Sequence, residues 1–437
     1  MMLAVLPFAA FAEGGTEQDP FEDITTPHLL LMEAETGAVM YERKGYEKAY
    51  PASTTKLMTA ILAAENIQDM SRVVTVGWRA VSGFGPKSSL MGLKGGEEIA
   101  LIDVLHGLMM RSGNDAAKEL AIETVAEVYG DAVEEADAVD KFIEMMNDKA
   151  AELGMVNTHF ATVDGRHNEE HYTTAYDFAL LMQYVLKNEL VSKVISTVTY
   201  DIPPNNKHSA GYHLENSNKL ICKKETDTTS FLYEYCIGGK TGETNQAGYC
   251  LASASKKDDV TLILIQFGDS NANGRLTTYR YKVAKEIYDW GFSNYGEMTL
   301  EEIGVETEFT IQTTGYSPFD EQLGKLDVRA DIDGLSVKGI MTDLYKLKAA
   351  PDAINVEIHI DNPTAPINEG DLIGHAEYYI DGVTPISAPL YACRSIAAAA
   401  EIKEQESPAN ININNTPPPD SGEIGKLRFA QSAGGSE

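Results

Sequence analysis

The chain has few cysteines, little positive charge and almost no long apolar segments. Its four cysteines among 437 residues form no C-x-x-C pair, which excludes a disulfide scaffold and the usual zinc or redox motifs. We predict buried thiols, although a disulfide bridge between Cys222 and Cys236 is also compatible with the sequence because these residues flank one short loop.

Lys and Arg number 35 against 66 Asp and Glu, and the net charge of −31 argues against nucleic acid as a partner.

The one long apolar segment lies at the start of the chain and runs from Leu3 to Phe11. It leads into Ala10-Phe11-Ala12, the small-x-small pattern that precedes signal-peptide cleavage, although a charged n-region is missing. We therefore predict a signal peptide over residues 1–12, a leader over 13–27, and an exported protein of the cell envelope or wall. No other segment approaches the roughly 18 uncharged apolar residues of a membrane span, so we expect the protein to be soluble or held peripherally at the membrane or wall.

Hydrophobic periodicity predicts a chain with both helices and strands, α/β in the broad sense and α+β more narrowly, with one large domain over residues 28–297. Residues 28–43 predict a hairpin, and apolar side chains on every face of the following helix, residues 53–65, predict that it is buried. Residues 101–190 have helical periodicity, whereas 235–255 and 260–268 predict strands, followed by a helix over 276–290. Strict alternation over residues 354–361 indicates a separate β-domain over 298–395, and the polar residues 396–437 predict a disordered tail.

Three short motifs carry the residues that can do chemistry: Ser53-Thr54-Thr55-Lys56, Ser112-Gly113-Asn114 and Lys240-Thr241-Gly242. Residues three apart on a helix share a face, so Ser53 and Lys56 are in contact geometry for a hydroxyl and its base. Lys56 can act as that base only when neutral, and both burial and the second ammonium of Lys240 would lower its pKa. A second S-x-x-K, Ser253 to Lys256, lies beside a charged turn, and we assign it to a surface turn.

The combination of S-x-x-K, S-x-N and K-T-G is typical of active-serine enzymes that recognise penicillin. Over residues 27–394 the sequence resembles the low-molecular-mass penicillin-binding proteins of peptidase family S11, which are D-alanyl-D-alanine carboxypeptidases. The resemblance includes "LMEAETGAVMYE", "HYTTAYD", "GGKTGETNQAGYCLASA" and "DWGFSNY". It implies an antiparallel sheet flanked by helices with a helical subdomain, followed by a small all-β domain.

The resemblance also implies a role for each site residue. Ser53 attacks the penultimate D-alanine carbonyl of a peptidoglycan stem pentapeptide, Lys56 is its base, and Ser112, between the two lysines, passes the proton to the leaving amine. Asn114 holds the substrate amide, and the backbone N–H groups of Ser53 and Glu243 stabilise the oxyanion. The terminal carboxylate is bound by Lys240, Thr241 and Arg280, and Gly242 of the same Lys-Thr-Gly motif also belongs to the substrate-binding residues. β-Lactam antibiotics acylate the same serine, and no cofactor is implied.

The sequence departs from the family pattern at two positions. Glu243 stands where histidine or an aromatic residue is common, so either its side chain points to solvent or it alters substrate preference. Asp164 and Gly165 belong to a loop without the usual asparagine-proline form, so its geometry cannot be carried over from the family.

Other functions were weighed against this prediction. His167 to His171 fits H-x-x-E-H, but the segment follows a glycine and has no apolar face, so we predict a solvated loop and no metal. A class A β-lactamase is disfavoured because no E-x-x-L-N is present. Two alternatives remain: a DD-endopeptidase that cuts the cross-link, and a turnover-deficient penicillin-binding protein that interacts with the wall.

Overall fold

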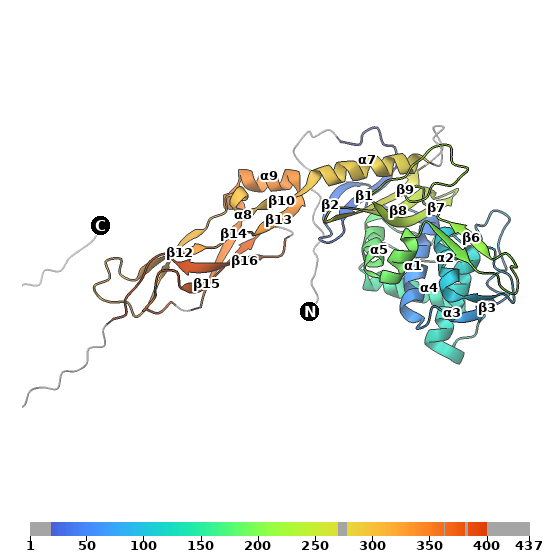
Figure 1. The fold of residues 1–437 in the computed structure, drawn as a ribbon, viewed down its shortest axis with the longest axis horizontal. Helices are drawn as coiled ribbons and strands as arrows, with labels where there is room; N and C mark the ends of the chain where they lie inside the picture. Colours follow the sequence, from blue (N-terminus) through green and yellow to red (C-terminus); the bar gives the residue numbers. More distant parts are fainter. Residues whose placement is uncertain (1–18, 270–277, 362, 381–382, 400–437) are drawn as a thin grey trace, which may run out of the picture.

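The computed structural model describes residues 19–269, 278–361, 363–380 and 383–399. Figure 1 shows an elongated molecule in which a larger mixed α and β domain is followed by a narrower, mostly β domain. The helix α7 (Tyr279–Asn294) leads directly into the first strand of the second domain, β10 (Tyr295–Thr299). The predicted signal peptide, residues 1–12, and most of the predicted tail lie outside the described residues. Within the described residues, no helix combines the length and apolarity needed to cross a bilayer.

The large domain is built on a five-stranded antiparallel sheet in the order β2-β1-β9-β8-β7. Its strands are β1 (His28–Glu33), β2 (Val39–Arg43), β7 (Cys236–Thr244), β8 (Gly248–Lys257) and β9 (Val260–Asp269). Successive side chains of β1 enter different cores, because Leu29 and Leu31 pack with α7 whereas Leu30 and Met32 pack with the helical subdomain. The sheet is therefore buried on both faces, as its nearly continuous apolar strands require.

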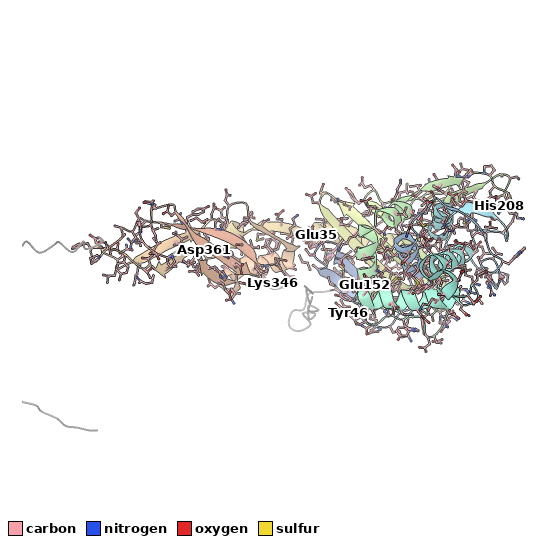
Figure 2. All side chains as sticks on the ribbon, turned by 90° about the horizontal axis from the view of Figure 1, so that it is seen from below. Glu35, Tyr46, Glu152, His208, Lys346 and Asp361 are labelled. Atoms are coloured by element: carbon pink, nitrogen blue, oxygen red, sulfur yellow. The ribbon has the colours of Figure 1, made fainter. Side chains whose placement is uncertain are left out.

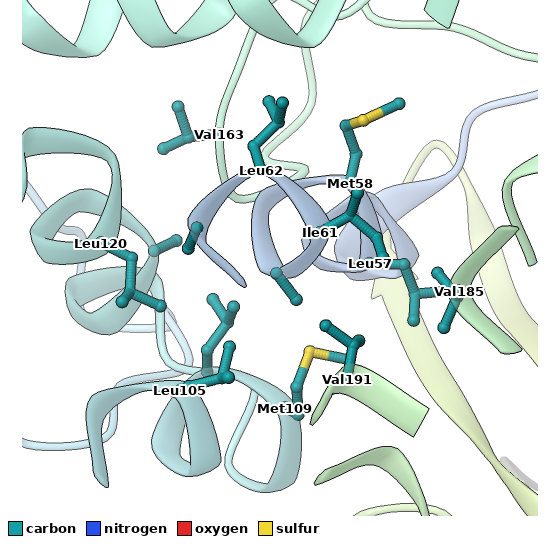
Figure 3. Packing of buried hydrophobic residues seen from close by; sticks show 14 of the residues in the cluster. Leu57, Met58, Ile61, Leu62, Leu105, Met109, Leu120, Val163, Val185 and Val191 are labelled. Atoms are coloured by element: carbon teal, nitrogen blue, oxygen red, sulfur yellow. The ribbon is translucent and has the colours of Figure 1, made fainter. Parts of the chain in front are cut away.

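The helical subdomain lies on the face of the sheet opposite α7. It contains α1 (Lys56–Asn66), α2 (Leu101–Met110), α3 (Asn114–Tyr129), α4 (Ala138–Glu152), α5 (Ala175–Lys187) and α6 (Glu189–Ser196). Two small ribbons complete it, β3 (Val73–Thr75) with β4 (Glu98–Ala100) and β5 (Thr199–Ile202) with β6 (Tyr212–Glu215). Figure 3 shows α1 enclosed by its neighbours, with Leu57 and Ile61 among side chains from α2, α3, α5 and α6. Since fully burying one such side chain contributes about 1.5–3 kcal/mol, α1 is a rigid platform for the residues before it.

The second domain has a core of its own, which begins at Met298. Its main sheet has the order β11-β12-β16-β15-β14, and a separate pair joins β10 to β13. The elements are β11 (Glu308–Gln312), β12 (Lys325–Ala330), β13 (Ser336–Ile340), β14 (Asn355–Ile360), β15 (Leu372–Tyr379), β16 (Ile386–Ala392), α8 (Leu300–Ile303) and α9 (Met341–Ala349). In Figure 2, Lys346 and Asp361 mark this domain, whereas Tyr46, Glu152 and His208 mark the larger one.

The predicted α+β fold with a separate β-domain is confirmed, and three local predictions are corrected. The closing helix continues to Asn294, past its predicted end at residue 290; the described part of it begins at Tyr279, and residues 276 and 277 lie outside the described residues. Ser53 lies in a 3-10 turn before α1 rather than in the helix. The second S-x-x-K is not a surface turn, because Ser253 is fully buried in β8 and its hydroxyl lies 2.9 Å from that of Tyr288.

Candidate active site

The nucleophile candidate Ser53 is held in a tight turn by two threonines. The hydroxyls of Thr54 and Thr55 donate to the carbonyls of Pro51 and Ala52, three residues back, at 2.6 and 2.7 Å. Such back-bonding favours the 3-10 turn Ala52–Thr55 over a continuous α-helix at this point. Ala52 has a φ of +48°, a conformation costly for a residue with a Cβ. The turn therefore stores strain directly before the serine and presents its hydroxyl at the end of the rigid α1 platform.

Lys56 contacts Ser53 as the spacing predicted, and its ammonium is fully buried. Its Nζ lies 3.0 Å from Ser53 Oγ, 2.8 Å from Asn114 Oδ1 and 2.6 Å from the backbone oxygen of Asp164. The two latter oxygens can only accept hydrogen bonds. In the neutral amine they take both N–H groups, so the lone pair is left facing the Ser53 hydroxyl. This arrangement is suited to taking the serine proton.

Burial is the main cause that lowers the pKa of Lys56, to about 8. The nearby carboxylates of Asp164 and Asp115 oppose the shift, and Arg166 adds to it weakly. Burial also lowers the pKa of Lys240 well below its usual value, and the cations of Lys56 and Arg280 lower it further. We expected the charge of Lys240 to lower the pKa of Lys56. Instead, the charge of Lys56 lowers the pKa of Lys240.

Lys240 and Ser112 are in contact with each other. Lys240 Nζ donates to Ser112 Oγ at 3.0 Å and to the Thr241 backbone oxygen at 2.8 Å. Ser112 has a φ of +55°, which places its hydroxyl in a strained turn between α2 and α3. We expected Ser112 to contact both lysines. In the structure it contacts Lys240, whereas Lys56 is bonded to Asn114.

The strand β7 passes directly beside the nucleophile turn. A Cβ at Gly242 would lie 3.0 Å from Ser53 N and from the Pro51 oxygen, so glycine permits the approach. The backbone N–H groups of Ser53 and Glu243, the expected oxyanion donors, thus belong to two elements in contact. The Glu243 side chain is exposed, which answers the question raised by its departure from the family pattern.

Arg280, in the first turn of α7, is buried beneath β7. Its Nη1 donates to the backbone oxygens of Gly242 at 3.0 Å and Cys250 at 3.2 Å. The Gly242 oxygen and the Glu243 N–H belong to the same peptide unit. Holding that oxygen therefore fixes the direction of the N–H on the other side of the plane.

The sequence analysis left open the geometry of the loop around Asp164 and Gly165, and it assigned no role to this loop, which contacts Lys56 and the turn of Ser53. Gly165 has a φ of +80°, and a Cβ there would lie 1.9 Å from the Ala52 oxygen, so this loop touches the nucleophile turn. His171 ties the two together: its Nδ1 accepts from the Ala161 N–H at 2.9 Å, and its Nε2 lies 2.8 Å from Thr55 Oγ1. Burial lowers the pKa of His171 to about 4, so the ring is neutral near pH 7.

The structure also shows where the H-x-x-E-H segment, one further serine and the cysteines lie. Both ring nitrogens of His171 are occupied by protein groups, so H-x-x-E-H is not arranged here as a set of metal ligands. Ser217, which the sequence analysis did not select, lies with its hydroxyl 3.0 Å from that of Thr241. The four cysteines are free, so Cys222 and Cys236 form no bridge; Cys222 and Cys250 are buried as predicted, whereas Cys236 is partly buried and Cys393 is exposed. Burial raises the pKa of Cys250 to about 12, as expected of an inert thiol.

The fold and this arrangement define a class: active-serine enzymes of the penicillin-binding type, in which a lysine one turn away serves the serine. Comparison with known proteins narrows the class. A family model described as D-alanyl-D-alanine carboxypeptidase, Peptidase S11, matches residues 14–271. The D-alanyl-D-alanine carboxypeptidase DacF of Bacillus subtilis is 31% identical, over 92% of this chain and 93% of its own length. DacA of Escherichia coli is 26% identical, over 85% of this chain and 84% of its own length.

Solved structures agree with this assignment. A Streptomyces DD-transpeptidase matches with a TM-score of 0.54 and 28% identity, over 62% of this chain and 98% of its own. A D-alanyl-D-alanine carboxypeptidase DacD from Francisella tularensis, at 22% identity and a TM-score of 0.56, covers 86% of this chain and 94% of its own, which supports the fold including the β-domain. The chain belongs to the D-alanyl-D-alanine carboxypeptidase family, peptidase family S11, and is a serine peptidase of that kind.

Proposed function

We propose that this enzyme removes the terminal D-alanine from peptidoglycan stem pentapeptides through an acyl-enzyme on Ser53. The observation that carries the proposal is the environment of Lys56 Nζ, where two obligate acceptors leave its lone pair for Ser53 Oγ at 3.0 Å. In the proposed first step the Ser53 proton moves to Lys56 while Oγ attacks the carbonyl of the penultimate D-alanine. The negative charge on the tetrahedral oxygen is stabilised by the N–H groups of Ser53 and Glu243.

The second step releases D-alanine and leaves an ester on Ser53. The carbon–nitrogen bond breaks, and the leaving amine takes a proton from the Ser112 hydroxyl, which Lys240 contacts at 3.0 Å. The proton held by Lys56 then replaces the one lost by Ser112. This transfer requires the two side chains to come into contact in the substrate complex, because in this structure Lys56 is bonded to Asn114. Water then hydrolyses the ester, with neutral Lys56 again able to accept a proton. A β-lactam would follow the first half of this path, because its ring amide opens onto Ser53 and an ester forms.

The charge of the site suits a substrate that ends in a carboxylate. Lys56, Lys240 and Arg280 are buried near one another in a chain whose net charge is −31. The guanidinium of Arg280 keeps its positive charge, and a carboxylate bound beside Lys240 would favour the ammonium form of that lysine. We assign the terminal carboxylate to Lys240 and Thr241, with Arg280 behind them, and the substrate amide to Asn114.

The proposed location follows from the substrate. Peptidoglycan stem peptides lie outside the cytoplasmic membrane, so we propose that the enzyme is exported and acts in the envelope. Peripheral contact with the wall or the membrane is proposed for the same reason.

The direct test is release of free D-alanine from an N-acylated peptide that ends in D-Ala-D-Ala. We expect release from this peptide and none from the matched peptide that ends in L-Ala-L-Ala. Labelling by a fluorescent penicillin is measured on the same preparation. Labelling without release would contradict the proposal and favour the endopeptidase or the turnover-deficient binding protein.

Arg280 gives a prediction about β7. Arg280→Gln removes both the charge and the bond to the Gly242 oxygen, so kcat should fall together with a rise in KM. Because hydrogen bonds from charged groups contribute about 1.5–3 kcal/mol, we expect kcat/KM to drop about tenfold to a hundredfold. The measurement is steady-state D-alanine release, with thermal unfolding as the check on folding.

Two further variants separate the effect of the Arg280 charge from that of its hydrogen bonds and control for the loss of an arginine elsewhere. Arg280→Lys keeps the charge but not the planar guanidinium, whose Nη1 donates to both carbonyl oxygens, so it should recover KM more than kcat. Arg79→Gln, which removes an exposed arginine paired with Glu135, should leave both constants unchanged. An unchanged kcat/KM in Arg280→Gln would contradict a role for Arg280 in positioning the strand or the substrate.

A further inference from the structure

Two histidines and two glutamates gather on the solvent face of the β-domain, far along the chain from the serine site. The strands β14 and β15 pair antiparallel, with His359 opposite His375 and Glu357 opposite Glu377. Residues two apart on a strand share a face, so the four side chains form a square on one side of the sheet. The residues between them face the core of the domain. Asp361, which follows β14 directly, shows where this strand lies in Figure 2.

The side chains of this square already converge. The imidazole rings of His359 and His375 are stacked, with centroids 4.8 Å apart and planes inclined by 17°. His359 Nε2 lies 3.7 Å from one oxygen of Glu377, and His375 Nε2 lies 3.8 Å from the other. Each of the three residues offers one ligand atom, and these atoms lie within 4.8 Å of one another. Donors bound at about 2.0–2.2 Å to one tetrahedral ion lie only slightly closer together, so small side-chain rotations would close the site.

The square also holds negative charge that the described residues do not neutralise. Glu357 and Glu377 are directly opposite, and like charges in that position destabilise a strand pair. Within the described residues, neither carboxylate pairs with a lysine or an arginine, and the basic side chains beside them are the two histidines. Tyr379 donates its hydroxyl to Glu377 Oε2 at 2.6 Å and lies 3.5 Å from Glu357 Oε2. This contact orients Glu377, as supporting residues do around metal ligands.

We propose that His359, His375 and Glu377 bind a divalent transition-metal ion of the Zn²⁺ class, with Glu357 beside them as a fourth donor. Two imidazoles favour zinc, copper, cobalt or nickel over the oxygen-seeking magnesium and calcium ions. Two neutral imidazoles and two carboxylates would match the ion's double positive charge. The ion would fasten the edge strand β14 to β15 and remove the repulsion between the two glutamates. This inference is independent of the function proposed for Ser53.

The test is a titration of the full-length protein, freed of metal by a chelator, with Zn²⁺ in a calorimeter. We expect one ion per chain, with a Kd in the micromolar range, and a higher Tm when the ion is bound. Co²⁺ should give the visible absorption of a site with nitrogen and oxygen ligands. His375→Gln and Glu377→Gln should each weaken binding at least about tenfold, since each removes a donor to the ion.

A matched control is His213→Gln, which removes an exposed histidine 2.6 Å from Asp201 that belongs to no larger cluster among the described residues. Its affinity for Zn²⁺ should equal that of the unmodified protein. Thermal unfolding of each metal-free variant verifies that the β-domain is folded, and penicillin labelling does the same for the large domain. Two results would overturn the proposal. If His375→Gln bound Zn²⁺ as tightly as the unmodified protein, the ion would bind elsewhere. If the unmodified protein showed no saturable binding up to about 1 mM Zn²⁺, the cluster would be only a solvated polar surface.

Discussion

Replacing Ser53 by alanine is expected to abolish D-alanine release and covalent labelling by penicillin together. Without Oγ no ester can form, and the remaining site offers only binding and the oxyanion donors. Loss of an activated nucleophile typically costs about 10⁴-fold or more in turnover. The fold should survive, because the Ser53 side chain is only partly buried and the turn is held by Thr54 and Thr55. Release of D-alanine and mass spectrometry of the penicillin adduct measure the two effects.

The chain supplies a matched control for this variant. Ser253 begins the other S-x-x-K but contacts Tyr288 within the core. Ser253→Ala should keep both activities and lose about 1 kcal/mol of stability, the usual contribution of one buried hydrogen bond. A penicillin adduct that persists in Ser53→Ala would show that another residue is the nucleophile.

Replacing Lys56 by methionine is expected to reduce the acylation rate nearly as much, by about 10³- to 10⁴-fold, because the serine then has no base. Methionine keeps the length of the side chain and removes the cost of burying an amine, so a folded protein is expected. The rate of penicillin acylation, followed in a stopped-flow instrument, measures the effect.

The same measurement across pH identifies the base. With the pKa of Lys56 at about 8, the ammonium form prevails below pH 8, and the acylation rate should fall about tenfold for each further unit of acidity. The rate should rise through pH 8 and level off above it. In Lys56→Met it should be low and nearly independent of pH. The control Lys256→Met, which changes the exposed lysine of the second motif, should behave like the unmodified enzyme. A flat profile between pH 7 and 9 in the unmodified enzyme would contradict Lys56 as the base.

Both predictions depend on how the site is supported, and most of that support is tertiary. Asp164 accepts a hydrogen bond from Lys56 through its backbone oxygen, a contact that any residue could supply, so the sequence does not mark it; its carboxylate acts on Lys56 only through the charge. His171 lies within a stretch that resembles the family, but only its packing against Thr55 shows that it links two loops. Arg280 was expected at the substrate carboxylate. Its contact with the Gly242 oxygen adds a structural role that the resemblance to the family did not indicate.

The sequence by itself determined the features that depend on near neighbours. The three-residue spacing of Ser53 and Lys56 fixed their contact, because a single turn brings such residues together whatever surrounds it. The alternation from Ile354 to Asp361 fixed a half-buried strand for the same reason. Only the tertiary structure decided which other groups complete the site and which of the two S-x-x-K motifs lies in it. Ser253 fits the same motif as Ser53, yet strand pairing buried it in the core. Likewise, His359 and His375 become neighbours through the register of two strands, and register is set by packing across the whole sheet rather than by local spacing.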